Sequence, residues 1–384
     1  MRTPHRIATM LIFGLVLTAS TTAQVREEKP TDSVIVSEAA FFRIETIAEG
    51  FTVPWGIAFL SDAELLLGER EPGRLWRVNI ETGDRTEITG LPDMLRDDGI
   101  SSGLFDIHLH PGYAENGWVY IAYGVGTEAA NGLAVARIRI DGNAVSETET
   151  IFESRTRIAG KWHFGGRLGF SGEHLFITTG DGYDFSAHAQ DAGSHAGKVL
   201  RIKDDGTIPE DNPFIGREGA MPEVWSLGVR NPQGMAIHPE TGEPWINEHG
   251  PQGGDEVNIA RAGLNYGWPV ITYGEEYGGG PIGEGITHKE GMEQPRYYWV
   301  PSIAPSGASF YQGDAFPKWQ GNMFGGALAL THINRLVVEG DRILHEERLL
   351  DDKGWRVRFV EPGPDGHLYF AVDDGMLMRL VPAN

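Results

Sequence analysis

The chain has 384 residues, contains no cysteine and carries 54 acidic against 32 basic residues, a formal net charge of −22. This charge argues against binding to nucleic acid or to an anionic membrane surface, both of which need basic patches. The missing cysteine excludes disulfides, thiolate chemistry and lipid attachment through a cysteine. The length suits either two ordinary domains or one domain built from repeats.

The first residues predict an export signal. Arg2 and Arg6 precede an apolar run over residues 7–19, and small residues at 21–23 offer a cleavage position. The run is short for a transmembrane helix, although an uncleaved N-terminal anchor is the alternative. We therefore predict a signal peptide over 1–23, a periplasmic location with no membrane insertion after cleavage, and a loose polar segment over 24–40.

A hairpin pattern then recurs six times. Each copy has a short apolar strand, a turn rich in Gly, Pro or Asp, and a second strand rich in aromatic or β-branched residues. The copies begin near residues 56, 106, 167, 234, 307 and 358, and further strand-like runs cover 75–80, 134–140, 198–202, 335–338 and 376–380. Repeats of this size are typical of propeller blades. We predict an all-β fold in which residues 41–384 form one six-bladed β-propeller of four-stranded antiparallel blades. An array of β-sandwiches is the alternative.

Three segments between the hairpins carry residues that could do chemistry. His163 stands in Trp-His-Phe-Gly-Gly-Arg-Leu (162–168), where a neutral histidine beside glycines could act as a general base or be purely structural. Arg230 and Asn231 could hold carboxylate or carbonyl groups, although Arg230 could equally cap a loop through backbone carbonyls. The loop from Asp181 to Asp184 could line a cleft.

The other candidates point to a cation and an anion. Glu-His-Gly-Pro (248–251) and Asp-Glu (255–256) could offer carboxylate and backbone oxygens to Ca²⁺, or form a solvated acidic turn. Arg356 and Arg358 alternate along one strand, so both should point to the same side, where an anion between them would relieve their repulsion. Exposure at a sheet edge explains the same spacing. Residues 270–300 form the longest irregular insertion.

Together and in this order, these motifs resemble the soluble aldose sugar dehydrogenases of the glucose/sorbosone dehydrogenase family, which depend on pyrroloquinoline quinone (PQQ). The similarity runs from about Phe51 to the C-terminus. It rests on motifs at residues 163–168, 189–191, 197–201, 208–214, 230–235, 247–251, 253–256, 265–269 and 363–369.

The resemblance implies a six-bladed propeller with PQQ and Ca²⁺ in a cleft at its top face. By position, it assigns His163 as the catalytic base, Arg230 and Asn231 as contacts of the quinone, and Arg356 and Arg358 as contacts of its carboxylates. The carbonyls of Gly250 and Pro251 would ligate the cofactor's Ca²⁺. Glu256 and the backbone of Tyr266 would ligate a second, structural Ca²⁺. Two positions depart from the family pattern. Ser101 replaces a cofactor-contacting Gln, and Ala329 replaces a Lys, which removes one positive charge from the site of an anionic cofactor.

These roles predict oxidation of the C1 hydroxyl of an aldose to a lactone. His163 removes the hydroxyl proton, Arg230 and Ca²⁺ polarise the quinone, and the electrons pass to an external acceptor. The alternatives are a Ca²⁺-dependent propeller hydrolase such as a lactonase, and a non-catalytic sugar-binding propeller. The sequence allows either a monomer or a homodimer.

Overall fold

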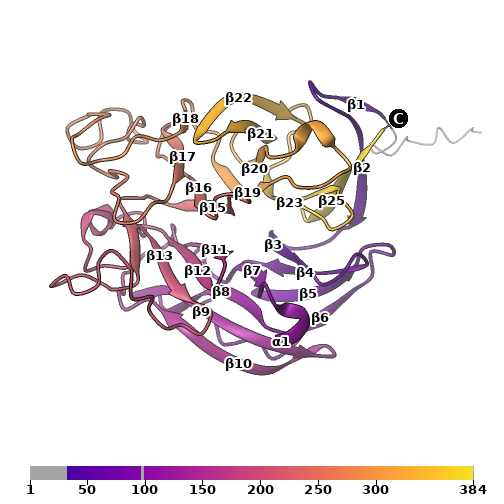
Figure 1. Ribbon diagram of the computed structural model, residues 1–384, viewed down its shortest axis with the longest axis horizontal. Helices are drawn as coiled ribbons and strands as arrows, with labels where there is room; N and C mark the ends of the chain where they lie inside the picture. Colours follow the sequence, from indigo (N-terminus) through magenta and orange to yellow (C-terminus); the bar gives the residue numbers. More distant parts are fainter. Residues whose placement is uncertain (1–32, 97–98, 384) are drawn as a thin grey trace, which may run out of the picture.

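Six antiparallel sheets follow one another around a central axis (Figure 1). The computed structural model describes residues 33–96 and 99–383. The predicted signal peptide lies outside these residues. Each predicted hairpin forms the two inner strands of one sheet, so the prediction of a six-bladed propeller with four-stranded antiparallel blades is confirmed, and a short fifth strand is added to the last sheet.

Five blades follow the chain order, with the first strand of each at the axis and the last at the rim (Figure 1). Their strands are β3 to β6 (Pro54–Phe59, Glu64–Glu69, Arg74–Asn79, Arg85–Ile88), β7 to β10 (Leu104–Leu109, Val119–Thr127, Ala130–Asp141, Ala144–Glu153), β11 to β14 (Gly165–Ser171, His174–Thr179, Lys198–Lys203, Val224–Leu227), β15 to β18 (Pro232–Ile237, Pro244–Glu248, Asp255–Ile259, Tyr297–Trp299) and β19 to β22 (Pro305–Phe310, Met323–Ala327, His332–Glu339, Arg342–Leu349).

The sixth blade joins the two ends of the chain. Its inner strands are β23 (Val357–Pro362), β24 (Leu368–Val372) and β25 (Met376–Pro382). The outer strands come from the start of the chain: β2 (Phe41–Ala48) pairs with β25, and β1 (Ile35–Val36) pairs with β2. Because β23 also contacts β3, the ring closes without an open seam between its first and last blades.

Burial along the strands follows their position in the blade. The second strand β4, with sequence Glu-Leu-Leu-Leu-Gly-Glu, has no exposed residue because neighbouring blades cover both of its faces. The rim strand β10 carries a run of polar residues, Ser-Glu-Thr-Glu-Thr (146–150), and is mostly exposed. In the part of the chain that the structure describes, helical structure is limited to α1 (Tyr113–Asn116) and the 3-10 turns η1 (Ser186–Gln190) and η2 (Pro317–Trp319). No helix within the described residues has the length and apolar character needed to cross a membrane.

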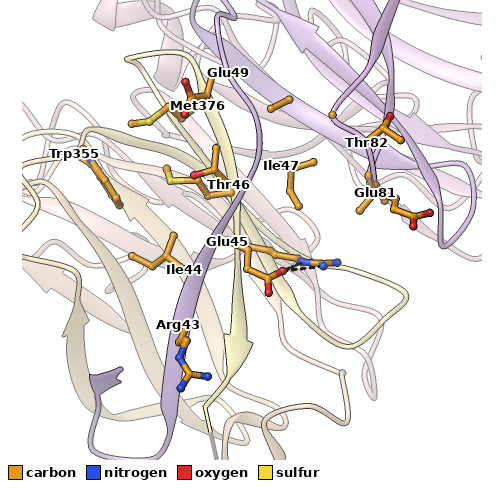
Figure 2. Close-up of a pocket in the computed structure, with 15 residues that line it drawn as sticks. Arg43, Ile44, Glu45, Thr46, Ile47, Glu49, Glu81, Thr82, Trp355 and Met376 are labelled. Atoms are coloured by element: carbon orange, nitrogen blue, oxygen red, sulfur yellow. Dashed lines mark hydrogen bonds and ion pairs between the residues drawn. The ribbon is translucent and has the colours of Figure 1, made fainter. Parts of the chain in front are cut away.

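A hollow of about 870 Å³ lies at the junction of the sixth and first blades. Figure 2 shows β2 crossing it, with Trp355 and Met376 on one side and Glu81 and Thr82 on the other. Glu45 forms an ion pair with Arg379 there, with 2.8 Å between Oε2 and Nη2. None of the residues predicted to form the functional site lines this groove, so it belongs to the closure of the ring.

The antiparallel hairpins bring the candidate residues to one end of the ring. In each blade the inner strand starts where the second strand ends, as in the pair of Gly165 with Thr179. His163 and Arg230 come just before inner strands, whereas Asp181 and Gly250 follow second strands. Because all six blades share this topology, residues far apart in the sequence meet around the axis.

Candidate active site

His163 and Asp181 form a buried hydrogen-bonded pair at this end of the ring. Nδ1 of His163 lies 2.7 Å from Oδ1 of Asp181, whose side chain is completely buried. The indole Nε1 of Trp268 donates to the other carboxylate oxygen, also at 2.7 Å. Since a carboxylate accepts hydrogen bonds, Nδ1 of His163 carries a proton, and Nε2 is the nitrogen that can accept one.

Two glycines make this pair possible. A Cβ atom on Gly180 would lie 2.0 Å from the carbonyl oxygen of His163, so only glycine fits beside the histidine backbone. Gly165 has a φ of 69°, in the left-handed region, and His163 itself has a φ of 60°. The His-Phe-Gly-Gly motif thus lets two strand ends approach closely and turns the imidazole toward Asp181.

Burial lowers the pKa of His163 below its ordinary value of 6.5, and the positive charge of Arg230 acts in the same direction. The hydrogen bond and the charge of Asp181 oppose this decrease. The imidazole is therefore neutral at pH 7, which is the state that a general base requires.

Arg230 and Asn231 lie next to this pair. Nη1 of Arg230 donates to the carbonyl oxygens of His249 and Gly250, both at 2.9 Å, and its own carbonyl accepts from the backbone N–H of Asp181 at 2.8 Å. Both side chains are buried. Oδ1 of Asn231 accepts from the backbone N–H of Gly165 at 3.3 Å. The Arg230 segment is thus tied to the loop of the base and to the Gly-Pro turn.

The Gly250–Pro251 turn is held by Asp255. Its carboxylate accepts hydrogen bonds from the backbone N–H groups of Gly250, Ile303 and Ala304 and from the hydroxyl of Ser302, at 2.7 to 2.9 Å. Within the described part of the chain, the Pro251 carbonyl accepts no hydrogen bond and the Gly250 carbonyl accepts only that of Arg230. Both oxygens therefore retain lone pairs that a cation could use.

Arg356 and Arg358 share one carboxylate, that of Asp373. Nε of Arg356 lies 2.9 Å from Oδ2 of Asp373, while Nε and Nη2 of Arg358 each lie 2.8 Å from an oxygen of the same group. Burial lowers the pKa of Arg358 to about 9, partly offset by Asp373, and the charges of Arg70 and Arg356 lower it further. One carboxylate thus faces two guanidinium groups, with a third cation nearby.

That third cation, Arg70, stacks with Arg358 on the same indole. The guanidinium carbons of Arg70 and Arg358 lie 4.1 and 4.0 Å from the ring centroid of Trp55. Arg70 also contacts Glu71, but its Nε atom and the Nε1 atom of Trp55 are buried and find no hydrogen-bond partner in the described part of the chain. This cluster joins the first blade to the sixth and has unused donors in a region of positive charge.

Glu248 and Glu256 form a buried carboxylate pair under the Arg230 segment. They are opposite each other in the register of β16 and β17, and Nδ2 of Asn258 lies 3.3 and 3.0 Å from their carboxylate oxygens. Burial raises the pKa of Glu248 to about 7, while burial and the charge of Glu248 raise that of Glu256. The backbone N–H of Arg230 donates to Glu248. Two carboxylates this close favour a proton or a cation between them.

Tyr266, Ser101 and Ala329 are three further residues that the sequence assigned to the site or its surroundings. Tyr266 is buried, and its carbonyl oxygen accepts no hydrogen bond from the residues that the structure covers. Ser101 lines a hollow together with Trp162 at the start of β7. Ala329 is exposed and borders a cleft of about 560 Å³ that is also lined by His249, Gly250, Pro251, Tyr273 and Tyr277. This volume is typical of small-molecule sites.

The family model described as Glucose / Sorbosone dehydrogenase matches residues 51–379. The chain belongs to this family. This confirms the resemblance inferred from the motifs and the predicted enzyme class, a dehydrogenase.

This family member is 39% identical to aldose sugar dehydrogenase YliI of Escherichia coli (strain K12) over 359 residues, which cover 92% of this chain and 96% of the relative. It is similar to the apo-form crystal structure of the soluble aldose sugar dehydrogenase from Escherichia coli, with a TM-score of 0.84, 37% identity and coverage of 89% of this chain and 100% of the other. The PQQ-bound aldose sugar dehydrogenase from Streptomyces coelicolor gives a TM-score of 0.71 at 26% identity, covering 88% and 97% of the two chains.

The sequence motifs missed four residues of this site: Trp55, Arg70, Trp268 as the partner of Asp181, and Asp373. A signal for two of them was present in the repeat. Arg70 and Asp373 directly follow the second strands of their blades, near the position that Asp181 and Gly250 take in theirs. Comparing this position across the six repeats would have drawn attention to them.

Proposed function

We propose that the protein is a PQQ- and Ca²⁺-dependent dehydrogenase that oxidises the C1 hydroxyl of aldose sugars to lactones and passes the electrons to an external acceptor. One observation carries the proposal: a buried neutral base, His163, shares one end of the propeller with Arg230, Arg356 and Arg358. The names of the Escherichia coli and Streptomyces coelicolor relatives support an aldose substrate, and the PQQ-bound state of the latter supports the cofactor.

The chemistry of the site fits PQQ, which is planar and polyanionic. Among residues 33–96 and 99–383, Arg356 and Arg358 have only Asp373 as a carboxylate partner, and Nε of Arg70 is buried without a hydrogen-bond partner, so further anionic groups would find donors here. The guanidinium of Arg230 also lies 5.2 Å from the ring of Trp268, which offers an aromatic surface beside a cation. Ala329 in place of the family's Lys removes one positive charge from the site. Arg70 supplies another.

The site also fits Ca²⁺. The ion prefers oxygen ligands, and the carbonyls of Gly250 and Pro251 retain free lone pairs on a turn that Asp255 holds rigid. Among the described residues, no group of three or more His, Cys, Asp or Glu side chains could hold a metal, so Ca²⁺ would have to use backbone oxygens. We assign a second Ca²⁺ to Glu256 and the carbonyl of Tyr266, next to the carboxylate of Glu248.

In the proposed reaction His163 accepts the C1 hydroxyl proton at Nε2. Asp181 holds the Nδ1 proton and stabilises the imidazolium that forms, as a carboxylate does beside other catalytic histidines. When bound, PQQ supplies the electrophile that takes up the C1 hydrogen with two electrons, which leaves the sugar as a lactone. Arg230 provides positive charge where negative charge develops, and its bonds to His249 and Gly250 fix its position. An external acceptor then removes the two electrons.

The proposal includes the cellular location, the partners and the oligomeric state of the enzyme. An export signal over residues 1–23 would place it in the periplasm, where sugars and a soluble acceptor are available without membrane insertion. The negative net charge of −22 favours solubility and a sugar or small carrier rather than nucleic acid as partner. Both a monomer and a homodimer are compatible with this role.

The decisive experiment is dye-linked oxidation of glucose and other aldoses by purified apo-protein, with PQQ and Ca²⁺ added together and with each omitted. Activity that requires both supports the proposal. His163→Gln should bind PQQ with nearly unchanged affinity but lose activity by orders of magnitude. No dye reduction under any combination would overturn the proposal, and lactone hydrolysis or sugar binding without oxidation would then identify a propeller hydrolase or a sugar-binding propeller.

A further inference from the structure

One guanidinium group joins four inner strands at the centre of the ring. Arg167 belongs to β11 and follows the motif that carries the base. Its Nε atom donates to the carbonyl oxygen of Gln233 on β15 at 2.6 Å, and its Nη1 atom donates to that of Trp55 on β3 at 2.9 Å. Nη1 also lies 3.4 Å from Oδ1 of Asp106 on β7. The first four blades, whose inner strands surround the axis in Figure 1, therefore meet at this side chain.

Asp106 fixes both the guanidinium and the strand that carries it. Its Oδ2 atom accepts a hydrogen bond from the backbone N–H of Leu168 at 2.8 Å, while Oδ1 faces Arg167. The side chains of Arg167 and Asp106 are only 5% and 8% exposed. A buried guanidinium that donates to two backbone carbonyls beside a carboxylate has little freedom to reorient. We call Arg167 and Asp106 the axial pair.

The two carbonyls that the axial pair holds belong to opposite sides of the candidate site. Trp55, in the first blade, carries the guanidinium groups of Arg70 and Arg358 against its ring. Gln233, in the fourth blade, donates from Nε2 to Oδ1 of Asn231 at 3.0 Å. In a ring of six blades the first and the fourth face each other across the axis. The axial pair therefore links the residues assigned to the carboxylates of PQQ with the residue assigned to its quinone.

The charge of Arg167 is balanced on the side away from these carbonyls. A cavity of about 40 Å³ lies there, lined by Asp106, His108 and Glu361 among others. Burial lowers the pKa of Arg167, whereas the charges of Asp106 and Glu361 oppose this decrease. Because a carboxylate lies directly beside the guanidinium, the axial pair adds little net charge to the candidate site. Its contribution to the site is therefore the position of the groups that it holds.

We propose that Arg167 and Asp106 are positioning residues for the cofactor, which hold Trp55 and Asn231 at the separation that PQQ requires. This inference rests on the proposed function. Neither residue lines the 560 Å³ cleft, so the axial pair acts through the carbonyls of Trp55 and Gln233. A site whose walls are fixed before binding does not lose affinity to ordering them when the ligand enters.

The test is isothermal titration of apo-protein with PQQ in Ca²⁺, at a temperature well below the melting temperature of each variant. Arg167→Met should raise the Kd for PQQ by about tenfold, the size of one or two lost hydrogen bonds. At saturating PQQ, kcat and the KM for glucose should change much less, because the hydrogen bond between His163 and Asp181 does not involve the axial pair. An unchanged Kd in Arg167→Met would overturn the inference.

Two conservative variants separate position from charge. Asp106→Asn removes a negative charge, which by charge alone would strengthen the binding of an anionic cofactor, whereas a loosened Arg167 should weaken it. Arg167→Lys keeps the positive charge but lacks the planar fork that reaches two carbonyls, so it should recover only part of the affinity. Tighter binding in Asp106→Asn, or full affinity in Arg167→Lys, would show that charge rather than position matters. Because Asp106→Asn preserves the side-chain volume, it decides the question even if Arg167→Met does not fold.

Arg335→Met provides the matched control. Arg335 lies on β21 of the fifth blade, its side chain is 4% exposed, and it donates to Glu347 at 2.7 Å and to Asn322 at 2.6 Å. Its loss should lower the melting temperature, as that of any buried hydrogen-bonded arginine does, but leave the Kd for PQQ at the wild-type value. An equal loss of affinity in Arg335→Met would reduce the axial pair to a general stabilising role. A wild-type protein that does not bind PQQ would instead contradict the proposed function itself.

Discussion

His163 and Asp181 are joined by a hydrogen bond of 2.7 Å between Nδ1 and Oδ1, although His163 precedes the first strand of the third blade and Asp181 follows the second. The carboxylate of Asp181 also accepts hydrogen bonds from the indole of Trp268 and from the backbone N–H of Tyr183. The carboxylate therefore cannot turn away from the imidazole without breaking two other hydrogen bonds. This arrangement fixes the tautomer of His163 and its orientation before substrate binds.

Replacing Asp181 by Asn should lower kcat by about a hundredfold or more, with a smaller change in the KM for the sugar. An amide neither fixes the tautomer of His163 nor stabilises its protonated form.

Since Asp181 raises the pKa of His163, its loss should move the acidic limb of the kcat/KM profile to still lower pH. In the wild type this limb should already lie below pH 6.5, because burial lowers the pKa of the base and activity requires the neutral imidazole.

The control for this prediction is Asp184→Asn, an exposed carboxylate three residues away, which should retain near-wild-type kcat and shift the acidic limb much less than Asp181→Asn, because its charge has the smallest effect on the pKa of His163. Steady-state rates between pH 5 and 9 provide the measurement. Full activity of Asp181→Asn would remove the carboxylate from the mechanism.

Replacing Arg70 by Gln should weaken PQQ binding by about tenfold, the loss of one charge-assisted contact. Arg70 is the cation that the motifs missed, and its guanidinium lies against the ring of Trp55. Arg70→Lys should restore only part of the affinity because an ammonium cannot stack or donate as a planar fork. Isothermal titration of apo-protein with PQQ in Ca²⁺ measures the effect without relying on turnover.

Arg74→Gln is the matched control, because Arg74 belongs to the same blade and its side chain is 49% exposed. It should bind PQQ like the wild type. The same affinity in both variants would show that Arg70 only supports Trp55.

Much of the fold could be predicted because its signals are local. The apolar strands, Gly- and Pro-rich turns and repeated spacing of the hairpins are encoded within short windows, and all six hairpins occur where the sequence places them. The closure of the ring was not visible in the same way. That β2 completes the last blade depends on pairing with β25, more than 300 residues away, which no local pattern reports.

In the candidate site, too, local sequence signals could be predicted and long-range contacts could not. His163, Arg230 and the Gly250–Pro251 turn were found because each stands in a motif beside a hairpin. The partners that set their chemistry come from other blades or other turns. Asp373 neutralises part of the repulsion between Arg356 and Arg358 that the sequence led us to assign to a bound anion, and Arg70 reaches Arg358 only because the first blade closes on the sixth. Such contacts follow from topology rather than from spacing.

Adding Ca²⁺ without PQQ should raise the melting temperature by several degrees, because a bound cation would neutralise the buried Glu248–Glu256 pair. In Glu256→Gln this response should disappear, while the metal-free protein should be at least as stable as wild type since two buried carboxylates no longer face each other. Thermal unfolding with EDTA or Ca²⁺ measures both effects. Glu87→Gln, an exposed change on β6, should behave like wild type. An unchanged Ca²⁺ response in Glu256→Gln would contradict the assignment.

Replacing Lys198 by Met should lower the free energy of unfolding by about 2–4 kcal/mol. Its buried Nζ atom donates to the carbonyl oxygens of His188, Ala189 and Ala196 at 2.6, 3.1 and 2.7 Å, which ties the turn η1 to β13.

Burial lowers the pKa of Lys198 from 10.5 to about 7. Between these values the unfolded chain binds a proton that the folded chain does not, so wild-type stability should rise with pH across this window relative to the Met variant. Urea denaturation at pH 7 and 9.5 tests this, with Lys203→Met on the same strand as the control. Parallel pH dependence in the wild type and Lys198→Met would show that the ammonium is equally charged in the folded and unfolded states.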